Sequence, residues 1–376
     1  PDLENDGRYR DDYYHYSRER GNQLLKKIRV LVVDDSALMR RIICDIIAEQ
    51  PDMELSGVAG NGLEALAGIN ASKPDVVTLD LEMPHMDGFE TLRNIMRRFP
   101  LPIIMVSSYT KSGSEATLKA LSAGALDFIP KPSAGFESEA FDELRHILPL
   151  KIRAAAAVKP GFIKYDKKQP APAHKEAVVK KERPPVHTLI AIGASTGGPK
   201  ALEALFSAFP ADLPAAVLLS LHMPPGFTLS YANRLNTLSA IQVKEGAEGD
   251  HVYAGRALIA PGGYHMKLKK DRISLDTGSK VNFVRPSIDV MLESLIDSPY
   301  KVIVVILTGM GKDGADGAAN LQKYKKDTLI LAQDPATAMI PSMPEAVIKS
   351  AAVSVTLPLE KMAAEIMRHA ARSVLK

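Results

Sequence analysis

The sequence predicts two α/β units, each built on a doubly wound, mostly parallel sheet, with a linker between them. Short apolar runs that end in polar residues, such as IRVLVVDD (28–35) and DVVTLDLE (75–82), alternate with helical patterns such as GFETLRNIMRRF. This alternation breaks between residues 149 and 186 and then resumes. At 376 residues the chain is also longer than one ordinary core supports. Together these observations indicate two parallel-sheet domains.

Composition narrows the class of protein. Hydrophobic residues make up 46% and charged residues 24%, which is typical of a soluble globular protein. The net charge of +3 argues weakly against a dedicated nucleic-acid binder. Cys44 is the only cysteine, so no internal disulfide can form, and this fits a reducing compartment. Since no run of 18 apolar residues occurs, we expect a cytoplasmic protein that does not insert into a membrane.

The same patterns set the expected boundaries. Residues 1–26 mix charges of both signs with tyrosines and have no periodicity, so we expect a disordered N-terminal extension. The first unit covers residues 27–148, the linker 149–186, and the second unit 187–376. The linker holds six prolines and ten Lys or Arg against three acidic residues. Its composition favours a solvated spacer over a segment that contacts nucleic acid or an acidic partner.

Three carboxylates of the first unit follow predicted strands, Asp34 and Asp35 after VLVV and Asp80 after VVTL. The carboxyl ends of parallel strands meet at one edge of the sheet, where clustered carboxylates favour a hard cation such as Mg²⁺. Ser107 and Lys131 follow later strands and can reach the same edge. Such a group is equipped to accept a phosphoryl group. Taken alone, Asp34 or Asp80 is better interpreted as a helix N-cap or a turn former, and it is their occurrence together with Lys131 that favours the phosphoryl site.

The segments VDDS, DLEMPHMDGFE, MVSS and GALDFIPKP resemble, in this order, the receiver domain of bacterial two-component response regulators. The resemblance implies a flavodoxin-like fold and phosphorylation of Asp80. It further implies that Asp34 and Asp35 hold Mg²⁺ together with Asp80, and that Ser107 and Lys131 contact the phosphoryl group.

In the second unit, LIAIGASTGGPKALEAL (189–205) reads as a strand, a glycine-rich turn and a helix. Such a turn could hold a phosphate or present Ser195. Its glycines, at positions 193, 197 and 198, match neither phosphate-binding spacing. GASTG instead fits G-x-S-x-G, a nucleophile on a sharp turn, although this short pattern alone is equally compatible with a plain turn.

A serine nucleophile needs a base and a group that orients the base. His222 follows the apolar run AAVLLSL, and Asp313 follows VIVVIL in a glycine-rich turn. We expect both to lie at carboxyl strand ends near Ser195. The alternatives are a hydrogen-bonded structural histidine at 222, and Asp316 in place of Asp313, although Asp316 better fits a capping or turn-forming role. His251 and His265 fall in a polar, glycine-rich stretch, so we expect them in surface loops.

The motifs IGASTGGP, LHMPPGFT, APGGYHM, RPSIDV and LTGMGKDGA resemble the catalytic domain of the chemotaxis-specific protein-glutamate methylesterase family, CheB. The resemblance implies Ser195 as nucleophile, His222 as base and Asp313 as its orienter, with the Thr196 region and the Met310 N–H stabilising the oxyanion. It implies no metal in this domain. Leu221 and Ser342 depart from the family pattern, in which we expect glutamine and glycine.

The resulting hypothesis is a phosphorylation-activated esterase that hydrolyses glutamyl γ-methyl esters on chemoreceptors and deamidates glutamines there. Its expected partners are the chemoreceptors and the chemotaxis histidine kinase, with no nucleic acid, and we expect a monomer. While the receiver is unphosphorylated it would block the catalytic face. The alternatives are a response regulator whose output domain binds a partner without chemistry, and a small-molecule esterase that uses the same triad.

Overall fold

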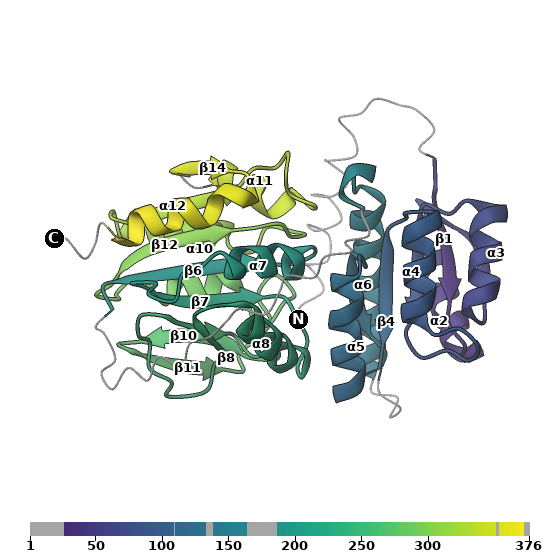
Figure 1. The fold of residues 1–376 in the computed structure, drawn as a ribbon, viewed down its shortest axis with the longest axis horizontal. Helices are drawn as coiled ribbons and strands as arrows, with labels where there is room; N and C mark the ends of the chain where they lie inside the picture. Colours follow the sequence, from purple (N-terminus) through teal and green to yellow (C-terminus); the bar gives the residue numbers. More distant parts are fainter. Residues whose placement is uncertain (1–25, 109, 133–137, 164–185, 351–352, 372–376) are drawn as a thin grey trace, which may run out of the picture.

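The computed structural model describes residues 26–108, 110–132, 138–163, 186–350 and 353–371. The predicted N-terminal disorder falls almost wholly outside these residues, and so does the linker from 164 to 185. Within the described residues the chain forms two units, each with its own sheet (Figure 1).

The first unit is a five-stranded parallel sheet in the order β2-β1-β3-β4-β5, the flavodoxin-like order. Its central strands β1, β3 and β4 are apolar and buried because helices cover both faces of the sheet. The elements are β1 (Ile28–Val33), α2 (Ala37–Ala48), β2 (Met53–Ala59), α3 (Gly62–Ser72), β3 (Val76–Asp80), α4 (Gly88–Arg98), β4 (Ile103–Ser107), α5 (Lys111–Ser122), β5 (Asp127–Pro130) and α6 (Ser138–Ala156), followed by a short 3₁₀ turn, η1 (Pro160–Phe162).

The second unit is a seven-stranded sheet in the order β14-β13-β12-β6-β7-β9-β8, in which every neighbouring pair is parallel. A separate antiparallel hairpin, β10-β11, completes it. The elements are β6 (Thr188–Ala194), α7 (Gly198–Ser207), β7 (Ala216–Leu221), α8 (Phe227–Leu238), β8 (Gln242–Glu245), β9 (Arg256–Ile259), β10 (His265–Lys269), β11 (Arg272–Asp276), α9 (Ile288–Glu293), β12 (Lys301–Ile306), α10 (Ala315–Tyr324), β13 (Leu329–Gln333), α11 (Ser342–Ser350), β14 (Val355–Leu357) and α12 (Leu359–Ala371).

Both sheets therefore have the predicted doubly wound, mostly parallel form. One local feature differs from the sequence pattern. Helix α6 runs to Ala156 with Pro149 inside it, so the boundary expected after residue 148 falls within a helix. Its apolar side chains Leu148 and Ile152 are fully buried, and this packing outweighs the local cost of a proline in a helix, about 3 kcal/mol.

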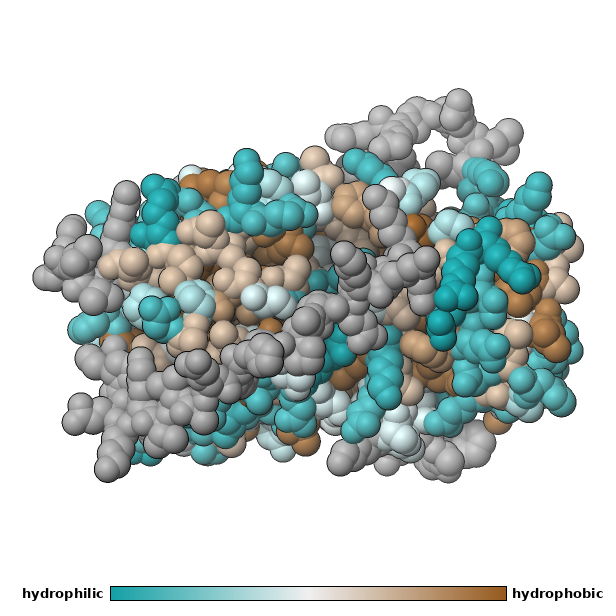
Figure 2. All heavy atoms as spheres, in the orientation of Figure 1, coloured by the Kyte–Doolittle hydropathy of each residue, from teal (hydrophilic) through white to brown (hydrophobic). Residues whose placement is uncertain are grey.

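The two units pack against each other through helices. Figure 1 shows α5 and α6 of the first unit facing α7 and α8 of the second. The view in Figure 2 shows hydrophilic residues over much of the outer face of the first unit. Among the described residues, no helix combines the length and the apolar character needed to cross a bilayer.

Candidate active site

The acidic residues of the first unit meet at the carboxyl end of its sheet, as predicted. Asp34 and Asp80 are buried and Asp35 is exposed, and one carboxylate oxygen from each lies within 4.8 Å of the others. The Lys131 ammonium lies 3.0 Å from Asp34 Oδ2 and 2.8 Å from Asp80 Oδ2. Three convergent carboxylates are the donor set that a hard divalent cation prefers, so the residues fit Mg²⁺.

In the described residues none of these aspartates caps a helix, but the turn-forming alternative is seen, because Asp34 Oδ1 accepts from Ser36 N (2.9 Å) and Asp80 Oδ1 accepts from Glu82 N (3.3 Å). Helix α2 is capped by Ser36, whose side chain accepts from Met39 N, and α4 is capped by Asp87. Burial, and the neighbouring Asp34 carboxylate after it, raise the pKa of Asp80 to about 6 against the opposing effect of Lys131. Asp80 is therefore a buried carboxyl group beside an ammonium, which suits it to accept a phosphoryl group.

Ser107 lies at the end of β4 but faces α5. Its Oγ donates to Gly113 O at 3.3 Å and lies 2.6 Å from Thr117 Oγ1. In the described part of the chain it makes no hydrogen bond to the acidic cluster. The predicted contact between Ser107 and a phosphoryl group would therefore require its hydroxyl to turn toward Asp80.

In the second unit the three predicted triad residues follow three neighbouring strands. Ser195 follows β6, His222 follows β7, and Asp313 lies in the loop between β12 and α10, while the strand order is β12-β6-β7. His222 Nε2 lies 2.8 Å from Asp313 Oδ2. Because the carboxylate can only accept, Nε2 carries the proton, and Nδ1 is the ring nitrogen left to act as a base. Among the described residues, no hydrogen bond joins Ser195 to His222.

The turn that carries Ser195 is held by the strand beside it. Ser195 N donates to Thr308 O (3.1 Å), and Thr308 Oγ1 donates to Thr196 O (3.0 Å). The close approach requires glycine at position 309, where a Cβ would lie 2.1 Å from Met343 Sδ and 2.8 Å from Ser195 Cβ. The strand–turn–helix context of G-x-S-x-G is therefore confirmed, and α7 begins directly after the turn.

The predicted oxyanion donors flank this turn. In the described residues, the N–H groups of Thr196 and Met310 have no protein acceptor, which leaves both able to bind an incoming oxygen. Ser342 Oγ donates to Gly309 O (2.9 Å) and accepts from Gly311 N (3.1 Å), so it fixes the loop on both sides of Met310. The serine that departs from the family pattern thus fixes the loop that carries the predicted oxyanion donor Met310.

Asp313 is almost completely buried and is surrounded by donors. Its Oδ1 accepts from Ser287 Oγ (2.7 Å), and its Oδ2 accepts from Ile288 N (2.6 Å) as well as from His222. Burial opposes its ionisation, but the hydrogen bond and charge of His222 outweigh burial, and the pKa of Asp313 is lowered. Its rival Asp316 lies exposed in the first turn of α10. The carboxylate that orients His222 is therefore ionised at neutral pH.

The expectation that His265 lies in a surface loop is wrong. It is the first residue of β10 and is only 2% exposed. Its Nδ1 accepts from Ser287 N (3.1 Å) and its Nε2 donates to Ser279 O (3.0 Å). His265 thus supports the serine that binds Asp313. The alternating pattern of HMKLK is typical of a strand, and Met266 and Leu268 are buried with His265, but the glycines and charges around it indicated a surface position for the histidine.

A contact between the units reaches the residue next to Ser195. Thr196 Oγ1 donates to Asp127 Oδ2 at 2.5 Å, and the Lys151 ammonium lies 2.7 Å from the same oxygen. Nearby, the rings of Phe128 and Phe227 lie 4.6 Å apart. Asp127 and Phe128 belong to β5 of the first unit. Sequence reasoning missed Asp127, because a charge at the start of a strand looks like any other surface residue.

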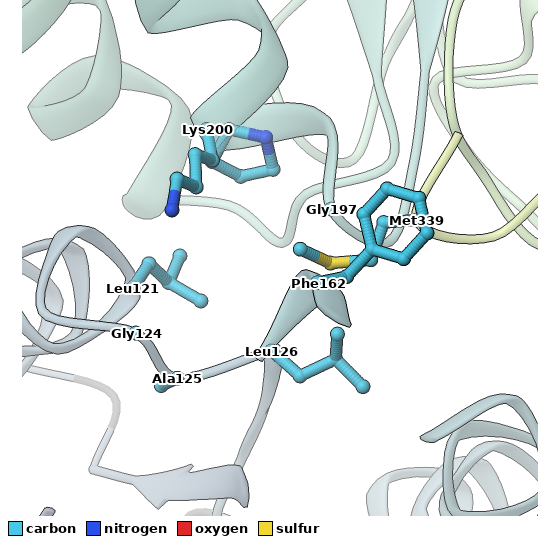
Figure 3. A pocket seen from close by; sticks show the side chains of 9 residues that line it. Leu121, Gly124, Ala125, Leu126, Phe162, Gly197, Lys200 and Met339 are labelled. Carbon is cyan, nitrogen blue, oxygen red and sulfur yellow. The ribbon is translucent and has the colours of Figure 1, made fainter. Parts of the chain in front are cut away.

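Further hydrogen bonds join the two units around this contact, and a small cavity lies between the units. Ser114 and Ser230 form a hydrogen bond across it (3.0 Å), and Ser122 Oγ donates to Glu203 Oε1 (3.3 Å). Both units line a small cavity of about 20 Å³, room for one water-sized molecule. Figure 3 shows Leu121 and Leu126 of the first unit on one side of it, and Lys200 and Met339 of the second on the other, with Phe162 beside Met339.

The chain matches two family profiles, the response regulator receiver domain over residues 30–138 and CheB methylesterase over residues 190–366. A protein-glutamate methylesterase/protein-glutamine glutaminase of Pyrococcus horikoshii is 44% identical over 91% of this chain and 94% of that protein. One of Symbiobacterium thermophilum is 44% identical over 92% of this chain and 98% of that protein.

Among solved structures, the CheB methylesterase catalytic domain of Thermotoga maritima is 38% identical, with a TM-score of 0.46, over 48% of this chain and 97% of that one. The two-unit fold, the profile matches and the full-length relatives agree. The chain therefore belongs to the CheB family of receiver-domain protein-glutamate methylesterases/protein-glutamine glutaminases.

Proposed function

We propose that this protein hydrolyses glutamyl γ-methyl esters and deamidates specific glutamines on chemoreceptors, and so provides adaptation in chemotaxis. The single observation that carries the proposal is the His222–Asp313 pair beside the strand-end turn of Ser195, at the ends of three adjacent strands. Full-length relatives that carry the same activity name support it.

The geometry supports acyl transfer through a serine ester. Ser195 Oγ attacks the ester carbonyl as His222 Nδ1 takes its proton, and the N–H groups of Thr196 and Met310 bind the oxyanion. The bond to the methoxy group then breaks, and His222 returns the proton so that methanol leaves. Water attacks the acyl-enzyme with the same base and releases glutamate and Ser195. A glutamine side chain follows the same path, with ammonia leaving in place of methanol.

Regulation is assigned to the first unit. The kinase would transfer a phosphoryl group to Asp80, while Asp34, Asp35 and Asp80 hold Mg²⁺, which neutralises charge on that group. Lys131 and Ser107 would contact its oxygens. In the unphosphorylated arrangement Asp127 of the first unit accepts a hydrogen bond from the hydroxyl of Thr196, the residue next to the nucleophile. This contact supports the proposal that the first unit blocks the catalytic face.

One strand supports the coupling of the two sites. β5 spans only Asp127–Pro130, with Asp127 in the interface at its start and Lys131 in the acidic cluster directly after its end. Because Lys131 and Asp127 are joined by this short strand, a shift of Lys131 on phosphorylation would also move Asp127. Phosphorylation would in this way favour an arrangement in which the two units separate.

The finer expectations belong to the same proposal. The domains predicted over residues 27–148 and 187–376 would be joined by a linker, with the first domain carried on to the end of α6 at Ala156. The protein would act as a cytoplasmic monomer, without nucleic acid and without inserting into the membrane that carries its substrate. Mg²⁺ would serve the receiver alone.

The test is methanol release from methylated chemoreceptor membranes, with and without Mg²⁺ and a small phosphodonor. We expect release that rises with phosphodonor, is abolished in Ser195→Ala and is unaffected in the control Ser274→Ala. Asp80→Asn should keep the basal rate and lose the activation. An active protein that is insensitive to Ser195→Ala would refute the proposed site.

The rival class, a response regulator that binds a partner without chemistry, predicts receptor binding without methanol release. A small-molecule esterase predicts turnover of simple methyl esters and none on receptors. Both outcomes can be read from the same membranes and a soluble ester assayed in parallel.

A further inference from the structure

The segment RPSIDV (285–290) surrounds Asp313 with hydrogen-bond donors. It also contains one acid, Asp289, to which the proposed chemistry gives no role. Ser287 Oγ and the N–H groups of Ile288 and Asp289 all donate to the Asp313 carboxylate, the last at 3.2 Å to Oδ1. The Asp313 carboxylate, which comes from the loop before α10, is therefore bound at the first turn of α9. Its carboxylate is held by an element that is distant in sequence and lies just before β12.

The carboxyl group of Asp289 makes the reciprocal contact. Its Oδ1 accepts from Gly314 N (2.9 Å) and Gly317 N (2.7 Å), the first turn of α10, which directly follows Asp313. Each of the two acids thus binds the first turn of the helix that belongs to the other. The three bonds to Asp313 and the two to Asp289 fix the two carboxyl groups relative to each other, because neither helix can move without breaking its bonds to the other acid.

A side-chain amide joins the two carboxyl groups directly. Asn282 Nδ2 lies 2.9 Å from Asp289 Oδ2 and 3.2 Å from Asp313 Oδ1. The packing leaves no slack around this arrangement. A Cβ at Gly317 would lie 2.7 Å from Asp289 Cα, and Asp289 itself is only 5% exposed.

Charge gives the two acids different states. Burial, and then the Asp313 carboxylate, raise the pKa of Asp289 to about 7, while the pKa of Asp313 is lowered. The other titratable groups around the pair are Asp316 on α10, His222 beside Asp313, and His265, which reaches it through Ser287. Two adjacent buried carboxyl groups do not both ionise readily. The negative charge therefore settles on Asp313, where His222 requires it, and the proton settles on Asp289.

We propose that Asp289 is a positioning residue of the esterase, which fixes the Asp313 carboxylate against His222 through the first turn of α10 and through Asn282. The inference rests on the proposed function and deepens it. A displacement of about 1 Å in such a group can lower a rate by 10²-fold. Asp289 touches neither substrate nor reacting atoms, so its loss should lower kcat and leave KM nearly unchanged.

Three variants and one control test this in the full chain, with phosphodonor and Mg²⁺ present. Asp289→Ala removes every hydrogen bond of the Asp289 side chain and leaves only its backbone N–H on Asp313, and it should lower kcat by about 10²-fold. Asp289→Asn resembles the protonated acid and still accepts from Gly314 and Gly317 through its oxygen, but its amide nitrogen cannot accept from Asn282, which keeps its bond to Asp313. This variant should therefore keep kcat within about tenfold of the parent. Asn282→Gly removes only the amide bridge and tolerates the backbone at that position, where φ is +52°. Asp316→Asn is the control. It replaces an exposed acid on α10 and should leave kcat and KM unchanged.

A spectroscopic readout separates this inference from the esterase activity. The proton in the hydrogen bond between His222 Nε2 and Asp313 should give a downfield NMR resonance, assigned by its loss in His222→Ala. We expect it to weaken in Asp289→Ala and Asn282→Gly and to persist in Asp289→Asn and Asp316→Asn.

The outcomes are decisive. An unchanged resonance in Asp289→Ala would overturn the inference, whether or not kcat falls, because a merely structural role lowers stability without moving that bond. A weakened resonance in a chain that releases no methanol would uphold the geometry and refute the esterase. Loss of kcat with the resonance weakened, and rescue by asparagine, would uphold both.

Discussion

Replacing Asp127 with alanine should release the catalytic face without phosphorylation. In the packed arrangement Asp127 Oδ2 accepts the Thr196 hydroxyl at 2.5 Å and lies 2.7 Å from the Lys151 ammonium. Asp127 and Thr196 are both buried. A hydrogen bond to a charged group in such a place contributes about 1.5–3 kcal/mol. The variant also leaves Lys151 half-buried without this partner, which disfavours the packed arrangement further.

The expected magnitude follows from that range. At about 1.4 kcal/mol for each factor of ten, the balance between packed and separated units shifts by about 10- to 150-fold. Methanol release without phosphodonor should rise by up to this factor, and activation by phosphodonor should shrink in proportion. Asp127→Asn, which keeps a neutral acceptor for Thr196, should give a smaller rise. Asp142→Ala, an exposed acid on α6, is the matched control.

The reasoning is refuted if folded Asp127→Ala shows the parent's rate without phosphodonor and the parent's full activation. That result would mean that the contact seen between Asp127 and Thr196 does not hold the units together. The apolar contacts, such as Phe128 against Phe227, would then have to carry the closure.

Three further predictions concern the turn, the cation and the buried acid. Gly309→Ala should lower kcat by at least about 10²-fold with little change in KM, because the added Cβ would lie 2.8 Å from Ser195 Cβ. Steady-state methanol release measures kcat and KM, and a normal kcat would contradict the close approach. Chelating Mg²⁺ should abolish activation by phosphodonor and leave the basal rate, so a basal rate that also falls would contradict a cation confined to the acidic cluster. Folded Asp289 keeps its proton up to about pH 7, whereas the unfolded carboxyl releases it near 3.8, so the folded state binds more protons between these values and loses stability as the pH rises through them. Asp289→Asn lacks this loss, and its Tm relative to the parent should therefore rise from about pH 4 to pH 7 in thermal unfolding; a constant difference would refute the raised pKa.

Much of the fold could be predicted because apolar strands and glycine-rich turns leave local signals. LIAIGA became β6, and the helix expected from Pro199 onward begins at Gly198. His222 and Asp313 form a hydrogen bond, and Ser195 follows the strand between theirs, because the carboxyl ends of adjacent parallel strands meet at one edge of the sheet.

What could not be predicted depends on contacts between distant segments. Asp127 and Asp289 carry no local mark, since the first matters through another domain and the second through the start of another helix. The domain boundary was placed inside α6 for a related reason. The stretch LKIRAAAAV has a helical pattern, but Pro149 signals a break before it, whereas buried apolar side chains continue the helix through the proline.

The strand order β12-β6-β7 has a consequence for how activity appears during folding. The three proposed catalytic residues are Ser195, His222 and Asp313. Asp313 follows β12, and β12 pairs with β6 although most of the second unit's sequence separates the two strands. Contacts between such distant segments form late, because the long loop between them must close first. A nascent or clipped chain would therefore hold Ser195 without its base in register, and esterase activity would report that the whole central sheet has assembled.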